Sequence, residues 1–252
     1  MIAADQPRVF DGAKAHVVVS SKADGNTRSL GDADIAEVSS NLEHIAHNAG
    51  FSFDSIVNMN VGARADVWDE IVDITEPPKH ALISLTDRVV ADALATTRTD
   101  VVIMLSVADC NAVAIHDPVH QVLAVAHLGW QSTAAELATK IVVHLQHKYQ
   151  SMPADLKVYF SPSIRAESYI FDTVSQGDDP DWKPFLHRSE KGIGIDLPGY
   201  NRMRFIEAGV SPDNIEMSPV NTATSDAYFS HYRAVRSGEP DGRLALFGQL
   251  LG

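Results

Sequence analysis

Apolar residues along this 252-residue chain form two patterns, short continuous runs and runs with helical spacing. The continuous runs predict buried β-strands at the following positions: 15–21, 55–62, 65–74, 101–110, 121–130 and 156–164. The helical spacing predicts helices at 35–50, 132–149 and 198–210, and short strands or turns are expected at 215–222 and 227–233. Strands interspersed with a few helices indicate an α/β (α+β) layered sandwich, with a central mixed β-sheet flanked by helices.

No repeat, low-complexity tract or linker rich in Pro, Gly or Ser divides the chain, so residues 1–252 are expected to form a single domain. The 33 acidic residues outnumber the 20 basic ones, which gives a formal charge of −13. This balance argues against nucleic acid or an anionic membrane as a partner, because both require clustered Lys and Arg. An anionic substrate would have to be met by local donors.

The location of the protein is predicted from its cysteine content and its N-terminus. A single cysteine excludes an intrachain disulfide and fits a reducing compartment. The N-terminal residues lack the architecture of a signal peptide, and no apolar stretch reaches the ~18 residues of a membrane span. A cytoplasmic protein, as a monomer or homodimer, is therefore expected.

Two of the apolar runs end in a potential metal ligand. Residues 101–110 end in Asp109-Cys110, and residues 121–130 contain His127 three residues before their end. If these runs form adjacent strands, they bring a thiolate and an imidazole to one edge of a sheet, as in zinc sites. We then expect the Cys110 sulfur and a His127 ring nitrogen to lie within about 4–5 Å of each other. The alternative is that both are core residues, because a lone Cys is often a small buried hydrophobe.

Further short motifs occur in order along the chain. They are the segments 91–93 (ADA), 107–110 (VADC), 127–132 (HLGWQS), 161–171 (SPSIRAESYIF), 196–210 (DLPGYNRMRFIEAGV), 228–233 (YFSHYR) and 242–245 (GRLA). Together they resemble the YfiH-type laccase-domain family, also called multicopper polyphenol oxidoreductase-like, and the resemblance covers nearly the whole chain.

The resemblance implies a purine nucleoside phosphorylase and adenosine deaminase activity, with zinc as cofactor. The substrates would be nucleosides of the adenosine, inosine, guanosine and methylthioadenosine class, together with phosphate or water. The residues it implies are Asp109, Cys110 and His127 as catalytic, Cys110 and His127 as metal ligands, and Asp92, Tyr169, His231 and Arg233 as substrate-binding. Asp109 would orient His127 or a metal-bound water.

The chain departs from the family pattern at residues that carry the chemistry. The family's third zinc ligand, a histidine, has no counterpart in residues 59–63 (MNVGA). Two family arginines are replaced by Gln131 and Leu42. The candidates for a replacement ligand are Asp109, His80, His231 and Asn60, and the candidates for replacing the lost positive charge are Arg64, Arg165 and Arg233. Because a catalytic zinc usually has three protein ligands, zinc is expected to bind weakly or not at all.

Three functions remain open at this point. The first is an active nucleoside phosphorylase-like enzyme. The second is a divergent member that binds a nucleoside-like molecule without catalysis. The third, copper-dependent phenol oxidation, ranks last because copper sites of that kind need several more His ligands.

A histidine restored at Val61 or Gly62 is expected to raise zinc occupancy, because it would supply the missing imidazole. Metal analysis of the purified variants measures this directly. If the wild-type protein already binds zinc tightly, and the added histidine improves neither occupancy nor nucleoside turnover, the interpretation of this site as lacking a ligand is wrong.

Overall fold

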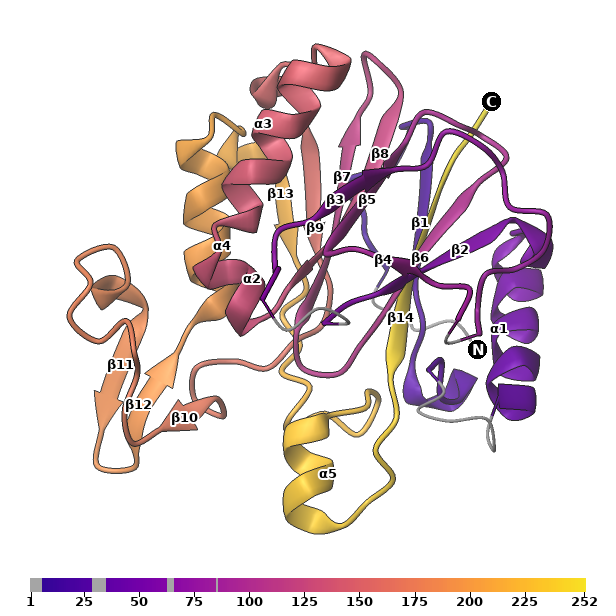
Figure 1. The fold of residues 1–252 in the computed structure, drawn as a ribbon. Helices are drawn as coiled ribbons and strands as arrows, with labels where there is room; N and C mark the ends of the chain where they lie inside the picture. Colours follow the sequence, from indigo (N-terminus) through magenta and orange to yellow (C-terminus); the bar gives the residue numbers. More distant parts are fainter. Residues whose placement is uncertain (1–5, 29–34, 63–65, 85) are drawn as a thin grey trace.

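The computed structural model describes residues 6–28, 35–62, 66–84 and 86–252. Most strands belong to two large mixed sheets (Figure 1). The first sheet has the order β1 (Ala15–Val19), β14 (Leu244–Leu250), β6 (Val102–Val107), β2 (Ile56–Asn60), β4 (Val89–Val90). The second has the order β13 (Ile215–Met217), β9 (Lys157–Phe160), β7 (Asn111–Asp117), β8 (Val122–Leu128), β5 (Ala93–Thr96), β3 (Ile71–Asp73).

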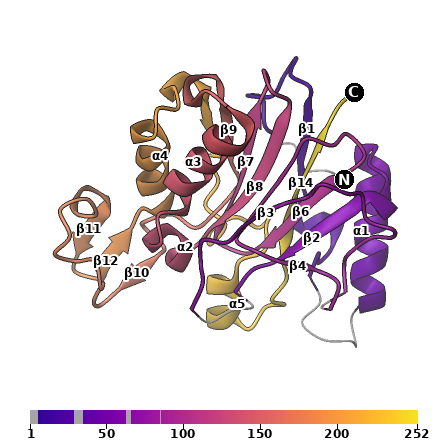
Figure 2. The ribbon, with the colours of Figure 1, turned by 45° about the horizontal axis from the view of Figure 1, so that its top comes forward.

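Helices cover the outer faces of the two sheets. On one side, α1 (Ile35–Ala49) packs Leu42 and Ile45 against the first sheet. On the other side, α3 (Leu137–Tyr149) and α4 (Leu197–Glu207) cover the second sheet. Figures 1 and 2 show the resulting order of layers, with α1 and the α3–α4 pair at opposite sides of the sheets. The predicted layered α/β sandwich with mixed sheets and flanking helices is confirmed.

The strands are divided between two sheets, whereas sequence analysis placed them in one central sheet. Every residue of β6 is buried, and its side chains alternate between two cores. Ile103 and Leu105 face the core between the sheets, while Val102 and Met104 face α1. A strand that is buried on both faces has a continuous apolar sequence in whichever sheet it lies. The apolar run of β6 therefore did not indicate which sheet it belongs to.

Three local predictions are corrected by the structure. The strand β7 follows Cys110 directly and was not predicted. The helix expected at 132–149 is two helices, α2 (Trp130–Ala134) and α3, separated at Glu136, whose φ is +62°. The segment 227–233 contains no strand, and α5 (His231–Ser237) begins within it. No helix in the described part of the chain is long and apolar enough to cross a membrane.

A smaller three-stranded sheet projects from the body of the protein (Figure 1). It has the order β10 (Ile170–Phe171), β12 (Gly192–Ile195), β11 (Leu186–Ser189). Its base packs on α4 through an aromatic cluster in which the rings of Trp182 and Tyr200 stack at 4.0 Å. The Trp130 ring lies 5.2 Å from the Trp182 ring, so this cluster connects the small sheet to the turn that follows His127.

The two large sheets approach closely at Gly248 of β14. A Cβ atom added there would lie 2.9 Å from Leu123 of β8. Gly248→Val is expected to lower the free energy of unfolding by about 1–3 kcal/mol, the usual cost of overpacking a core. Urea denaturation measures the change, and Gly252→Val is the matched control because a Cβ at Gly252 meets nothing within 4 Å. Equal stability of the two variants would contradict this account of the sheet contact.

Candidate functional site

Cys110 and His127 are brought together by the pairing of β7 with β8. The two strands are antiparallel, and Ala112 lies opposite His127 while Asn111 lies opposite Leu128. Cys110 precedes β7 and is therefore beside Gly129, which follows β8. The prediction that the runs 101–110 and 121–130 form adjacent strands is wrong, and β7 brings Cys110 beside the end of β8 instead. The run that ends in Cys110 forms β6, which belongs to the other sheet.

The side chains of Cys110 and His127 converge on one point. A Cβ atom on Gly129 would lie 3.0 Å from Cys110 Sγ and 3.1 Å from His127 Nε2. Cys110 Sγ and His127 Nε2 can therefore be no farther apart than the sum of these two distances. The predicted separation of about 4–5 Å is below this upper limit. Only a residue without a side chain leaves this space free, so Gly129 is a structural requirement of the pair.

Asp109 forms the turn that places Cys110. Its φ of +74° is in the left-handed region, which few residues other than glycine adopt. Its carboxylate accepts hydrogen bonds from Thr222 Oγ1 (2.6 Å) and from the Tyr232 backbone N–H (2.7 Å). These two bonds direct its carboxylate to the C-terminal segments, and the predicted role of Asp109 in orienting His127 or a metal-bound water stays a prediction.

Burial keeps both members of the pair uncharged near neutral pH. It raises the pKa of the Cys110 thiol to about 11, and the charge of Asp109 contributes in the same direction. Burial also lowers the pKa of His127 to about 4, assisted by the positive charge of Arg28. His127 Nδ1 is buried and has no hydrogen-bond partner among the described residues. The pair is therefore a thiol beside a neutral imidazole.

Two arginines that sequence analysis did not propose lie near the pair. Burial lowers the pKa of Arg28, and the charge of Arg243 lowers it further, so the two guanidinium groups are close. Arg28 Nε is buried without a hydrogen-bond partner in the described part of the chain. Thr27 positions Arg28, because its hydroxyl bonds to Ser106 Oγ (3.0 Å) and its N–H to the Arg243 carbonyl (3.1 Å). Arg243 stands in the GRLA motif, the one sequence signal that could have identified it.

An uncharged aromatic pocket of about 320 Å³ lies beside the pair. Its lining consists of Trp130, Gln131, Tyr169, Phe171, Thr173, Val174, Ser175 and Ile195. Burial raises the pKa of Tyr169 to about 12, and negative charge on Asp109 or on an ionised Cys110 raises it as well, so the phenol is within electrostatic range of both residues. Gln131, where the family pattern has an arginine, leaves this lining without a charge.

Arg165 lies on the opposite side of the small sheet from this pocket. Alternate residues of a strand face opposite sides. Tyr169 and Phe171 accordingly line the aromatic pocket, whereas Ile170 and Arg165 line a separate cavity of about 940 Å³. Arg165 therefore does not replace an arginine of the aromatic pocket. Arg64, the other candidate, lies outside the described residues.

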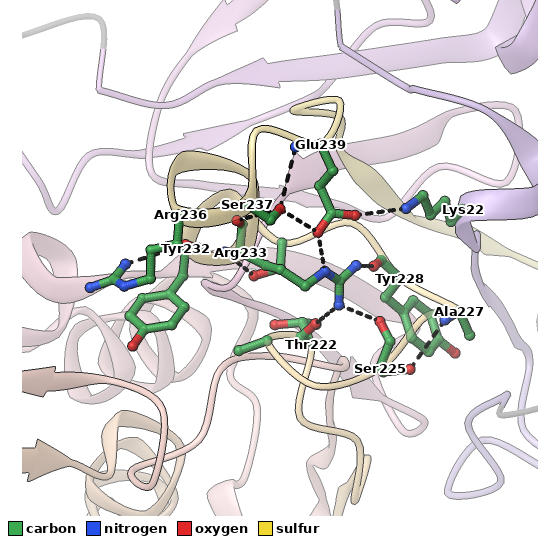
Figure 3. A network of polar contacts seen from close by, with 12 residues as sticks. Lys22, Thr222, Ser225, Ala227, Tyr228, Tyr232, Arg233, Arg236, Ser237 and Glu239 are labelled. Atoms are coloured by element: carbon green, nitrogen blue, oxygen red, sulfur yellow. Dashed lines mark hydrogen bonds and ion pairs between the residues drawn. The ribbon is translucent and has the colours of Figure 1, made fainter.

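Asp92 and Arg233, which the resemblance implies as substrate-binding together with Tyr169, do not line the aromatic pocket. Asp92 is buried beside His127, whose N–H donates to the Asp92 carbonyl (2.8 Å), but its carboxylate accepts from the Glu70 N–H (3.2 Å). It borders a cavity of only about 10 Å³. Arg233 lines neither pocket, because its guanidinium is engaged by the segment 222–228 and by Glu239 (Figure 3).

His231 lies at the start of α5 and is exposed. Its Nδ1 forms a hydrogen bond with Asp241 Oδ2 at 2.9 Å, and Asp241 in turn pairs with Arg243 at 2.5 Å. His231 is thereby linked to the arginines near Cys110 through one carboxylate. A direct contact with substrate remains a prediction.

The donor set around Cys110 and His127 does not fit zinc. The described residues contain no group of three His, Cys, Asp or Glu side chains that could hold a metal ion. Among the candidates for a third ligand, Asp109 is bonded to Thr222 and Tyr232, and His231 and the exposed His80 face other carboxylates. The positive charge of Arg28 beside His127 also disfavours a cation there.

The geometry distinguishes the two positions proposed for a restored histidine. Gly62 has a φ of +69°, and a Cβ there would lie 3.3 Å from the Trp68 ring. A histidine at Gly62 would therefore be strained. Val61 follows β2, which runs parallel to β6, and packs against the core that contains Val107. Val61→His is the better test of the missing ligand.

Comparison with known proteins identifies the family. The family model described as multi-copper polyphenol oxidoreductase laccase matches residues 18–249. The chain belongs to the laccase-domain family. A purine nucleoside phosphorylase of Staphylococcus epidermidis is 26% identical over 226 residues, which cover 84% of this chain and 82% of that protein. The human purine nucleoside phosphorylase LACC1 is 26% identical over 203 residues, which are 78% of this chain and 44% of that protein.

Solved structures share the laccase-domain fold of this chain. YlmD from Geobacillus stearothermophilus superimposes with a TM-score of 0.84 at 23% identity, over 98% of this chain and 94% of YlmD. Bacillus licheniformis YfiH gives 0.82 at 23% identity, over 96% of this chain and 94% of YfiH. These likenesses establish the laccase-domain fold, and the chemistry has to be argued from the residues described above.

Gly129→Ala tests whether the space beside Gly129 is part of the site. Because the new methyl group would lie against both Cys110 Sγ and His127, iodoacetamide should alkylate Cys110 several-fold more slowly than in the wild type. Gly129 has a φ of −92°, so alanine introduces no backbone strain. Cys110 is the sole cysteine, which allows mass spectrometry to follow one reaction. An unchanged alkylation rate would contradict the convergence of the two side chains.

Proposed function

We propose that this chain acts on purine nucleosides with phosphate as the second substrate, as the names of its relatives indicate for those proteins. The observation that carries the proposal is the position of the uncharged aromatic pocket. It is lined by Trp130, which directly follows Gly129, and by Tyr169, which is within electrostatic range of Cys110. Aromatic rings with a few hydroxyl and amide groups suit a neutral planar heterocycle such as a purine. The volume of about 320 Å³ is within the range of small-molecule pockets.

The charges around the pair suit phosphate. In phosphorolysis a phosphate oxygen forms a bond to ribose C1′, the bond from C1′ to the base nitrogen breaks, and the base takes up a proton. An uncharged thiol and imidazole do not repel the incoming anion. Arg28 and Arg243 would supply local positive charge in a chain that is acidic overall, and guanidinium groups bind phosphate well.

The same donor set leads us to propose that zinc binds weakly or not at all. Adenosine deamination, for which the family resemblance implies a metal-activated water, should then be slower than phosphorolysis. One observation favours a second function, nucleoside binding without catalysis, namely that the described residues offer no group of three metal-binding side chains. Copper-dependent phenol oxidation is still less compatible with this donor set.

Incubation of purified protein with inosine, adenosine, guanosine or methylthioadenosine is expected to release free base only when phosphate is present. Chromatography measures the base and ribose 1-phosphate. Arg28→Gln should reduce turnover by roughly tenfold or more, the effect of losing one charge-assisted contact. His127→Ala should also reduce turnover, because it removes the neutral imidazole beside Cys110. Arg98→Gln is the matched control, because Arg98 pairs with Asp100 in an exposed ion pair elsewhere on the surface.

Two results would contradict phosphorolysis in different ways. Free purine bases should quench the fluorescence of Trp130 if they enter the aromatic pocket. Quenching without any release of base from nucleosides would favour binding without catalysis. The absence of both quenching and base release would show that the pocket does not take purines.

A further inference from the structure

The turn at Asp109 is held by a part of the chain more than a hundred residues away. Its left-handed backbone conformation is less favourable than the right-handed one even for aspartate, and contacts with other segments stabilise it. The described residues provide three such contacts. Two come from the distant C-terminal segment, from Thr222 Oγ1 and the Tyr232 N–H, and the third runs from the Ile164 N–H to the Asp109 carbonyl (2.9 Å). Because Cys110 is the next residue, these contacts also determine where its sulfur lies.

Thr222 and Tyr232, which provide two of these contacts, belong to a segment organised by Arg233. Arg233 Nη1 donates to the carbonyls of Thr222 (3.0 Å) and Ser225 (2.6 Å), and Nη2 donates to the Tyr228 carbonyl (3.0 Å). Figure 3 shows the guanidinium surrounded by these three carbonyl groups. The loop 222–228 is thus folded around one side chain, and the Thr222 hydroxyl is presented to Asp109.

Glu239 and Lys22 fix the guanidinium from its other side. Arg233 Nε donates to Glu239, whose second oxygen accepts from Lys22 Nζ at 3.0 Å (Figure 3). The Arg233 and Glu239 side chains are only 18% and 24% exposed, so water competes little for this pair. The ion pairs Arg233–Glu239 and Lys22–Glu239 hold both ends of α5. The backbone N–H of Tyr232, near the start of this helix, donates to the Asp109 carboxylate.

We propose that Arg233 is a positioning residue for Cys110, acting through Thr222, the Tyr232 N–H and the Asp109 turn. Four of its five N–H groups are used within the protein, which leaves little for a substrate. This positioning role takes the place of the substrate-binding role that the family resemblance implies for Arg233. Its effect on turnover rests on the proposed function, whereas its effect on the thiol does not.

Arg236 provides a matched control on the same helix. It lies three residues beyond Arg233, its guanidinium stacks on the Tyr232 ring at 3.5 Å, and Nη1 donates to the Tyr232 carbonyl at 3.2 Å. These contacts are on the exposed side of α5 and reach neither the loop 222–228 nor Asp109. Comparing the Arg236 and Arg233 variants therefore separates the effect of losing any arginine of α5 from the effect of losing the contacts that Arg233 makes.

The decisive measurement is the alkylation rate of Cys110 in full-length protein under native conditions, with iodoacetamide in excess. Arg233→Gln should raise this rate by about tenfold or more, because alkylation follows the population of the open turn. Arg236→Gln should stay near the wild-type rate. Arg233→Lys should be intermediate, because lysine can retain the Glu239 ion pair but cannot bond to three carbonyls. Where nucleoside turnover is present, Arg233→Gln should lower kcat with little change in KM.

Thr222→Val provides a second variant that leaves Arg233 intact. It removes the 2.6 Å bond to Asp109 with almost no change in shape, so it should also raise the alkylation rate. A folded Arg233→Gln protein with wild-type alkylation would overturn the proposal. If Arg233→Gln does not fold, a wild-type rate in Thr222→Val would overturn it equally. Faster alkylation in a protein without nucleoside turnover would support the positioning role and contradict only the proposed function.

Discussion

The antiparallel pairing of β7 with β8 is the contact on which the candidate site depends. It sets Ala112 opposite His127, and so places Cys110 and Gly129 at the same end of the second sheet. A shift of this register by one residue would turn every side chain to the other face of the sheet. The register is secured because both strands are buried on both faces, between the first sheet and α3.

Burial also determines which side chains of the site are charged. An acidic chain with a formal charge of −13 places a neutral thiol, a neutral imidazole and two arginines together at one end of its sheets. The same low-polarity surroundings that keep Cys110 and His127 uncharged strengthen the field of the arginines. This combination suits an anion better than a divalent cation, and it agrees with the absence of a third metal-binding side chain among the described residues.

The C-terminal part of the chain completes the site from outside the sheets. Thr222 and the α5 backbone bind Asp109, Arg233 organises both, and Asp241 links His231 to Arg243. The small projecting sheet contributes Tyr169 and separates the aromatic pocket from the larger cavity that Arg165 lines. Residues that match family motifs thus take two kinds of role, since some surround the pocket and others hold the turn that carries Cys110.

The sequence by itself determined the fold class, the family and the pair Cys110 and His127. Continuous apolar runs mark strands buried on both faces, and motif order is preserved even where single residues change. These properties are local, because each depends on the identity and spacing of neighbouring residues.

Only the tertiary structure decided which strands are neighbours, and therefore which side chains meet. The run that ends in Cys110 and the run that contains His127 lie in different sheets. The strand β7, which brings Cys110 beside the end of β8, was not apparent from the sequence as a separate element. Arg28 and Arg243 are separated by more than two hundred residues, so their proximity has no local signal. Whether Arg233 points to a pocket or to backbone carbonyls depends on how α5 packs, which residue spacing does not encode.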